Sequence, residues 1–365
     1  MEVVSRHFEP FGAEKLSTNA MNPLFPRAAL LFATLTPFST PATHAQNLPK
    51  ALCEDGQCAP AIATLQYGGR RAYKLTDGKT QAVIVPDIGR VMSYGRVGGP
   101  NLLWNLAGSP GKEGWKNYGG DKTWLAPQSS WKAFHGKNSW PPDEAFDGKP
   151  HRAEVLSGGK VRMVSPLSPT GIRLTRTMYF ADNGDFVIEQ MARKERGAPV
   201  RASIWSVTQT VPGEAVFLPR DERSTYSNGF APMGKLTDSQ KIEQVTPKLL
   251  RVATFNRGGG SKIGVDAPVS SIASVRDGVA FVQKSPKPRG VYPDAEGGAG
   301  FPVELYVSGE AANFYLEMEL LGPLKNFSVG GKSTHTMRWS LHDLPSKNVD
   351  SPAVVSAMEK LLFAQ

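Results

Sequence analysis

The segment 174-LTRTMYFADNGDFVIEQM-191 decides the fold class of this chain. Leu174 to Phe180 and Phe186 to Met191 are runs with strand-like composition. Polar and apolar side chains alternate along parts of both, as they do in antiparallel strands with one buried face. Between the runs, Asp182-Asn183-Gly184-Asp185 contains the Asn-Gly pair that favours a tight hairpin turn. The segment therefore predicts two antiparallel strands joined by a short turn.

Runs of the same kind recur along most of the 365 residues. Glycine (37) and proline (29) are frequent and charged residues make up only 21%, which fits strands joined by turns better than a helical protein. One segment predicts a helix, Pro352 to Phe363, where Ser351 can cap the first turn. We therefore expect an all-β fold with a short C-terminal helix. The further predicted strands are Gln81–Val85, Arg90–Tyr94, Val161–Val164, Ala202–Val211, Ser271–Val275, Val279–Gln283, Val303–Val307, Phe314–Leu321 and Thr334–Leu341.

Residues 1–46 are typical of a signal peptide. Arg27 precedes an apolar run at 28–35, and Thr43-His44-Ala45 offers a small-residue cleavage site. We therefore expect export, to the periplasm or out of the cell. Met21 is the better start, because the segment that follows it contains every region of a signal peptide, and residues 1–20 then reflect the choice of start site. The alternative, an uncleaved anchor, is disfavoured because the apolar run is far short of the ~20 residues that a membrane span needs.

An N-terminal extension, residues 47–66, contains the two cysteines, Cys53 and Cys58. In an oxidising compartment they can close a small disulfide loop, and a pair of free thiols is the alternative. Two thiols without a neighbouring histidine supply too few ligands for a metal, so we expect no metal site. We expect no cofactor either, because no glycine cluster is placed as it is in a phosphate-binding loop.

Five of the seven tryptophans lie in or just before the segment 117–143, interleaved with polar side chains. An indole face beside hydrogen-bonding groups suits a ring that is polar at its edge and rich in C–H bonds on its face, as a sugar is. The segment therefore predicts a saccharide site, and tryptophans that only pack in the core are the alternative. The tryptophans are Trp104, Trp115, Trp124, Trp131 and Trp140, and the polar side chains are Asp121, Lys122, Gln128, His135 and Asp143.

The formal net charge is +9, and the segment up to Gln46 contains as many acids as bases, so a mature protein keeps the excess. A basic exported protein favours anionic partners such as acidic polysaccharides, although scattered charges also fit an ordinary soluble surface. No segment matches a nucleic-acid-binding module, and none is apolar enough to span a bilayer. We therefore expect a neutral or acidic saccharide as the partner, no nucleic acid and no membrane span. The sequence does not indicate the oligomeric state.

Val85 to Tyr94, followed by Asn101-Leu102-Leu103-Trp104-Asn105, resembles the start of the galactose-mutarotase-like superfamily. Its members commonly begin with a strand, a glycine-containing turn and a second strand before an Asn-Leu-Leu-Trp element. Within the superfamily the chain is most similar to an uncharacterised bacterial group, domain of unknown function 4380. The resemblance covers Tyr67 to Leu344. Its further motifs are Gly119-Gly120-Asp121-Lys122 to Pro127-Gln128, Trp140-Pro141-Pro142-Asp143, Lys262-Ile263-Gly264-Val265-Asp266, Tyr292-Pro293-Asp294 and Tyr315 to Leu320.

The resemblance implies a β-supersandwich domain over residues 67–344, a saccharide on a concave sheet face, and a C-terminal helix within 345–365. Members that interconvert sugar anomers use a glutamate base at the anomeric hydroxyl and a histidine acid at the ring oxygen. The family's late-strand Leu-Glu-Thr-Gln aligns with Leu316-Glu317-Met318-Glu319, which makes Glu317 the expected base. In a strand, Glu317 and Glu319 point to the same face. A solvent-facing pair of acids is the alternative.

The expected histidine is missing from the middle strand. The family's Asn-His-Thr-Tyr-Phe-Asn corresponds to residues 203–209, where Trp205 takes the place of the histidine and Gln209 lies further along. An indole N–H cannot protonate a sugar near neutral pH, so we consider His135 as a replacement acid.

Charged donors suited to sugar hydroxyls or carboxylates are Arg90 and Lys122. With Trp205, Gln209 and Glu319 they complete the expected sugar contacts. Two functions stay open: an aldose 1-epimerase-like isomerase, and a non-catalytic carbohydrate-binding protein of the cell envelope or of a polysaccharide-processing system.

The signal-peptide pattern predicts a mature amino terminus at Gln46 or Asn47. N-terminal sequencing of the protein recovered from the cell envelope or the medium tests this prediction. Recovery of an intact amino terminus upstream of Arg27 would contradict it.

Overall fold

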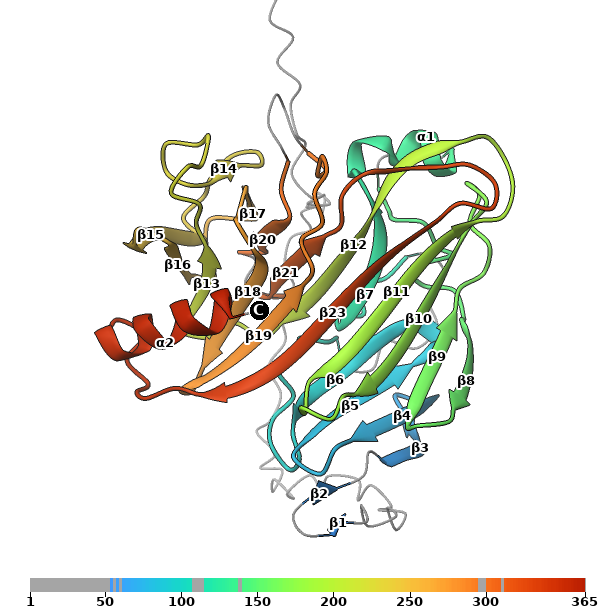
Figure 1. The fold of residues 1–365 in the computed structure, drawn as a ribbon, viewed down its shortest axis with the longest axis horizontal. Coiled ribbons are helices and arrows are strands. Elements are labelled where there is room, and N and C mark those ends of the chain that lie inside the picture. Colours follow the sequence, from blue (N-terminus) through green and yellow to red (C-terminus); the bar gives the residue numbers. More distant parts are fainter. Residues whose placement is uncertain are drawn as a thin grey trace, which may run out of the picture. The chain divides into compact units, whose positions relative to one another are not determined.

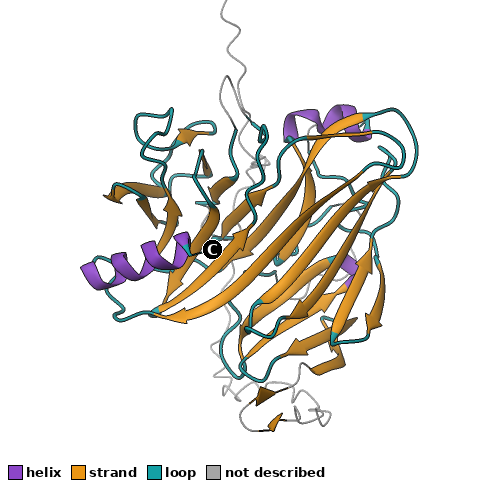
Figure 2. Cartoon of the chain, in the orientation of Figure 1, coloured by secondary structure: helices purple, strands orange, loops and turns teal. Residues whose placement is uncertain are grey.

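The hairpin expected from the sequence is present. β10 (Ile172–Phe180) and β11 (Phe186–Lys194) pair antiparallel, from Ile172 opposite Lys194 to Phe180 opposite Phe186. In the computed structural model, the two strands belong to a ten-stranded sheet that packs against an eleven-stranded one (Figures 1 and 2). The structure describes residues 61–106, 115–136, 140–294, 300–309 and 312–364, and the backbone of 53–54 and 57–58. All of them belong to one compact unit, Lys50–Gln365.

Both sheets are antiparallel throughout their named pairs. The ten-stranded sheet contains, in spatial order, β15 (Gln240–Thr246), β16 (Leu249–Thr254), β13 (Ala215–Pro219), β18 (Ser270–Arg276), β19 (Val279–Ser285), β23 (Lys332–Asp343), β11, β10, β9 (Lys160–Val164) and β8 (Arg152–Leu156). The eleven-stranded sheet contains β14 (Ala231–Pro232), β17 (Ser261–Val265), β20 (Val303–Val307), β21 (Leu316–Leu321), β12 (Val200–Thr210), β7 (Asp121–Ala126), β6 (Arg90–Arg96), β5 (Thr80–Val85), β4 (Arg70–Thr76) and β3 (Ala61–Tyr67), and β22 (Lys325–Phe327) pairs with β12.

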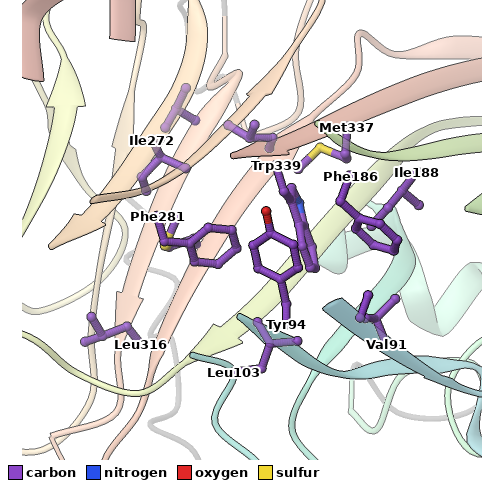
Figure 3. Packing of buried hydrophobic residues seen from close by; sticks show 14 of the residues in the cluster. Val91, Tyr94, Leu103, Phe186, Ile188, Ile272, Phe281, Leu316, Met337 and Trp339 are labelled. Atoms are coloured by element: carbon purple, nitrogen blue, oxygen red, sulfur yellow. The ribbon is translucent and has the colours of Figure 1, made fainter. Parts of the chain in front are cut away.

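The main hydrophobic core lies between the two sheets. Tyr94 of β6 places its ring 5.2 Å from Trp339 of β23 and 5.2 Å from Phe281 of β19, and Phe186 of β11 lies 5.6 Å from Trp339 (Figure 3). All four side chains are buried. Burying an aromatic or branched side chain stabilises a fold by about 1.5–3 kcal/mol, so this aromatic contact holds the sheets face to face.

A layer of polar contacts accompanies the apolar core between the sheets. Asp121 of β7 is fully buried and pairs with Arg176 of β10, and its second oxygen accepts a hydrogen bond of 2.8 Å from Thr208 of β12. Gln190 of β11 accepts from Thr123 and donates to Ser206 at 2.6 Å. Since β7 and β12 belong to one sheet and β10 and β11 to the other, these side chains tie the two sheets together.

Helices are short and few among the described residues. The predicted C-terminal helix is confirmed as α2 (Pro352–Phe363), and the Ser351 side chain accepts from the N–H of Val354 at 3.3 Å. Its buried residues pack with Phe217 and Val282 of the ten-stranded sheet. The others are α1 (Trp131–His135) and the 3-10 turns Pro86–Ile88 and Gln128–Ser130. No helix in the described part of the chain is long and apolar enough to cross a membrane.

The N-terminal side of the fold begins earlier than Tyr67. Strand β3 starts at Ala61 and is part of the eleven-stranded sheet, so the end of the expected extension belongs to the sandwich. Before it, β1 (Cys53–Glu54) and β2 (Gln57–Cys58) place Cys53 opposite Cys58 in backbone register. The disulfide itself stays a prediction, and the expected signal peptide lies outside the described residues.

The ion pair between the sheets predicts a large cost when one partner is removed. Arg176→Met leaves the Asp121 carboxylate buried without its cation, and losing one member of a buried pair costs about 3–5 kcal/mol of unfolding free energy. Urea denaturation measures this loss. The control is Arg162→Met, which removes a partly exposed cation paired with Glu154 and should cost less than about 1 kcal/mol. Equal losses in the two variants would contradict the role of the buried pair.

Candidate functional site

Strand β21 separates two environments. Leu316, Met318 and Leu320 belong to the main core, so Glu317 and Glu319 point to the other side of the eleven-stranded sheet. We call this side the outer face. Backbone register places Gln209 of β12 opposite Glu317, and Val207 opposite both Glu319 and Lys122 of β7.

Glu317 is the most accessible carboxylate on this face. It accepts a hydrogen bond of 2.9 Å from Gln209 Nε2 and one of 3.3 Å from Lys122 Nζ. Its exposed fraction is 7%, whereas Lys122 is fully buried. Burial lowers the pKa of Lys122, and the negative charge of Glu317 opposes that shift. The arrangement orients a hydrogen-bond acceptor at the edge of the solvent, which is what a sugar hydroxyl or an anomeric proton requires.

A second charged group lies beside the first. Lys262 of β17 places its Nζ 2.6 Å from Glu304 Oε2 and 2.8 Å from Glu319 Oε2. Trp205 donates its Nε1 hydrogen to the same Glu319 oxygen at 2.8 Å. Burial raises the pKa values of Glu304 and Glu319. Burial by itself would lower the pKa of Lys262, but the two carboxylates outweigh it and raise that pKa.

Five indoles form a contiguous group, the tryptophan cluster: Trp115, Trp124, Trp131, Trp140 and Trp205. Trp124 lies 5.4 Å from Trp131 and 5.2 Å from Trp205, and all three are buried. Their N–H groups have acceptors within the protein, since Trp124 donates to Asp147 and Trp131 to the carbonyl of Leu125. The cluster thus forms a packed support, and sugar contact by its buried members stays a prediction.

The cluster and the charged groups are in direct contact. Lys122 Nζ lies 5.0 Å from the ring centre of Trp124, and Lys262 Nζ lies 4.5 Å from that of Trp205. A cation over an indole face is stabilised by about 0.5–2 kcal/mol, most when water is excluded. The indoles therefore help to hold both ammonium groups on the outer face.

Three further aromatic side chains border Glu317, and we call them the aromatic rim: Trp104, Tyr306 and Tyr315. Trp104 and Tyr315 are half-buried, and their ring centres lie 4.7 Å apart. Tyr306 is the register partner of Glu317. Sequence reasoning missed all three as sugar contacts, because they come from separate strands and only Trp104 stood out by its type.

A glycine pair places Trp104. Gly120 has a positive φ of 68°, and a Cβ there would lie 2.3 Å from the carbonyl oxygen of Val91. At Gly119 a Cβ would meet the carbonyl of Trp104 at 2.3 Å. Two residues without side chains therefore let the segment around Trp104 pair with the start of β7.

The other predicted site residues lie away from Glu317. Asp121 was expected on the same face, but it points between the sheets because it precedes the outward-facing Lys122 by one residue. Arg90 is buried against Asp147. Gln128 begins a 3-10 turn, and Asp143 caps a turn through the N–H of Ala145. Trp140 is half-buried in the tryptophan cluster.

The four histidines of the described chain belong to other elements than the strands around Glu317. His135 ends α1 and has its ring 6.3 Å from that of Trp131. His335 and His342 belong to β23, and His151 contacts the carbonyl of Ala145. Burial lowers the pKa values of His151 and His335 to about 4. Within the described residues, no group of histidine, cysteine and carboxylate side chains is arranged to hold a metal ion.

Comparison with known proteins bears on the fold. No protein-family model matches the chain, and no curated protein sequence matches it. Among solved structures, a proposed mutarotase (YeaD) from Salmonella typhimurium aligns with a TM-score of 0.51 at 11% identity, over 77% of this chain and 94% of its own. The chain has a galactose-mutarotase-like fold.

Two further structures align at lower scores. A galactose mutarotase-like protein from Lactobacillus casei has a TM-score of 0.49 at 10% identity, over 77% of this chain and 100% of its own. A proposed aldose 1-epimerase from Escherichia coli K12 has a TM-score of 0.47 at 11% identity, over 78% of this chain and 100% of its own. The expected all-β supersandwich is confirmed, and at these identities the galactose-mutarotase-like fold does not by itself specify an activity.

The raised pKa of Glu304 predicts a pH-dependent stability. A carboxyl group whose folded pKa lies above its ordinary 4.5 contributes stability that is complete below that pH and is lost as pH rises through the folded pKa. Glu304→Gln removes this loss, so its unfolding free energy relative to the wild type should increase as pH rises above about 4.5. Urea denaturation across this range measures the difference.

The matched control is Glu222→Gln, because Glu222 is exposed. Its stability relative to the wild type should stay level over the same pH range. A level curve for Glu304→Gln as well would show that Glu304 carries no raised pKa in the folded protein.

Proposed function

We propose that this protein binds a saccharide on the outer face of the eleven-stranded sheet, above Glu317. The observation that carries the proposal is the juxtaposition of a partly exposed, oriented carboxylate with the half-buried rings of Trp104 and Tyr315. An aromatic ring beside a few convergent polar groups is the usual composition of a small-molecule site, and it suits the apolar face and polar edge of a sugar. The galactose-mutarotase-like fold supports the same ligand class.

Each part of the site has a defined task in this proposal. The aromatic rim stacks on the C–H face of the sugar. Glu317 accepts a hydrogen bond from a sugar hydroxyl, and Gln209 and Lys122 hold the carboxylate in place from below. Lys262 is the most exposed member of the charged cluster, so it is the donor available to a hydroxyl or to an acidic group on the sugar.

A second function, an aldose 1-epimerase-like isomerase, is favoured by one observation. Glu317 pairs with the ammonium group of Lys122, which stabilises the ionised carboxylate that a base must present. Its position also agrees with the residue expected as base from the resemblance. A binding protein without turnover needs the same contacts, so binding is the common proposal and isomerisation the additional one.

The proposal extends to the setting of the protein. We place the chain in the group called domain of unknown function 4380, on the motifs that resemble it, and the signal-peptide pattern supports export to the periplasm or beyond. The excess of basic residues supports acidic as well as neutral saccharides as ligands, in the envelope or in a polysaccharide-processing system.

Removal of one rim ring tests the site. Trp104→Ala deletes the half-buried indole that packs on Tyr315, and loss of the stacking surface should weaken binding by about 1–3 kcal/mol. Affinity is measured by calorimetric titration against a panel of neutral and acidic saccharides.

The control for this test is Tyr179→Ala, because Tyr179 is also half-buried but lies on β10 of the other sheet. It should bind every ligand as the wild type does. Undiminished affinity in folded Trp104→Ala would place the sugar elsewhere, and a wild type that binds no saccharide of the panel would contradict the proposed function.

A further inference from the structure

The place of the missing histidine is filled by two residues together. Trp205 takes its position in β12, and the indole N–H points to Glu319 Oε2 at 2.8 Å. Glu319 is therefore the nearest ionisable group to the position from which the histidine would act. It lies two residues from Glu317 on the same face of β21, about 6.6 Å along the strand.

Glu319 has a second carboxyl group beside it. Glu304 of β20 is its direct register partner, and neighbouring side chains in such pairs lie about 4.5–5.5 Å apart at Cβ. Both side chains have exposed fractions of 0%. Phe301 helps to cover Glu304, because it packs over Gly264, the register partner of Glu304 on β17, so closely that a Cβ there would lie 2.3 Å from its ring.

The charges of this pair do not balance when both carboxyl groups are ionised. Lys262 contacts Glu304 and Glu319 alike, so one ammonium group faces two carboxylates in a buried setting. Glu319 Oε1 and Glu304 Oε1 are buried and have no hydrogen-bond donor. One proton shared between the two carboxyl groups removes the excess charge and supplies the missing donor, as in other paired carboxyl groups.

We propose that Glu304 and Glu319 hold one shared proton and that Glu319 delivers it to the ring oxygen of a bound aldose, in the role of the absent histidine. The inference rests on the proposed sugar site and on its isomerase function. Glu317 and Glu319 are then the base and the acid of one reaction, two carboxyl groups kept in opposite protonation states by their different cations.

The step balances without a co-reactant. The Glu317 carboxylate takes the proton of the anomeric hydroxyl while the C1–O5 bond breaks, its electron pair goes to O5, and Glu319 protonates O5. The product is the open-chain aldehyde. Rotation about the C1–C2 bond followed by the reverse step on the other carbonyl face restores both protonation states and gives the other anomer.

Lys262 holds the pair in place rather than supplying the proton. The two carboxylates raise its pKa, so it keeps its proton over the range in which an acid catalyst must release one. Burial raises the pKa values of Glu304 and Glu319, which agrees with a proton retained on the pair near neutral pH.

The experiment compares Glu319→Gln with the wild type. Glu319→Gln leaves Lys262 paired one-to-one with Glu304, so the variant keeps a balanced charge and is expected to fold. Proton NMR of freshly dissolved, anomerically pure aldoses measures the exchange of anomers, and titration measures affinity. Exchange should fall by about 10²–10⁴-fold while affinity stays within a few-fold of the wild type.

Glu304→Gln supplies a readout that a purely structural role would not change. Without its partner, Glu319 faces Lys262 alone and ionises more easily, so the high-pH limb of the exchange rate should move to lower pH. Glu222→Gln, with its exposed side chain, should leave both the rate and the limb unchanged.

The outcomes separate the two proposals. Wild-type exchange in Glu319→Gln, or an unmoved limb in Glu304→Gln, would overturn the assignment of the acid. Sugar binding by the wild type without any acceleration of exchange would overturn it too, while leaving the binding site intact. A wild type that binds no sugar would instead contradict the proposed function on which the inference rests.

Discussion

Pairing of buried charges is the constraint on which this structure depends. Each side of the eleven-stranded sheet carries ionised groups away from water: Asp121 with Arg176 between the sheets, and Glu317 with Lys122 on the outer face. Taking such groups out of water costs several kcal/mol per ion, which their mutual attraction repays only when the geometry is good. Well-packed apolar residues in these positions would serve stability as well or better, so a charged cluster on the outer face is better explained by a ligand than by folding.

The two aromatic groups on that face have different consequences. The tryptophan cluster is packed and its buried indoles donate to protein acceptors, so it fixes the lysines and Trp205. The aromatic rim keeps exposed surface on Trp104 and Tyr315, next to the one carboxylate that reaches solvent. A rigid inner support and an accessible outer rim give a site that is pre-organised before a ligand arrives, which reduces the entropy cost of binding.

Sequence reasoning was most successful where local chemistry decides the structure. The Asn-Gly turn between β10 and β11, the capped helix at Pro352, and the alternation of Leu316, Glu317 and Met318 each depend on neighbouring residues only. Strand β7 shows the opposite case. Every residue from Asp121 to Ala126 is buried, because β7 is covered on both faces, so no alternation reveals that Asp121 and Lys122 point in opposite directions. The polar edge strand β15 was missed for lack of an apolar run.

The charged cluster was beyond reach from sequence for a topological reason. Lys262, Glu304 and Glu319 come from β17, β20 and β21, which are neighbours only through the sheet order. Glu319 was expected on the sugar face, but its partner carboxyl and the lysine between them were not. The aromatic rim likewise joins Trp104 to Tyr315, from segments more than two hundred residues apart.

The central claim is that a sugar lies on the outer face over Glu317, and a crystal structure of the protein with a bound saccharide tests it most directly. The account predicts a sugar ring stacked on Trp104 or Tyr315, with a hydroxyl within hydrogen-bond distance of the Glu317 carboxylate. The protein offers another recess, between α2 and strands β15 and β16, lined by Thr246, Arg251 and Glu359. A saccharide found there, with the outer face empty, would contradict the account.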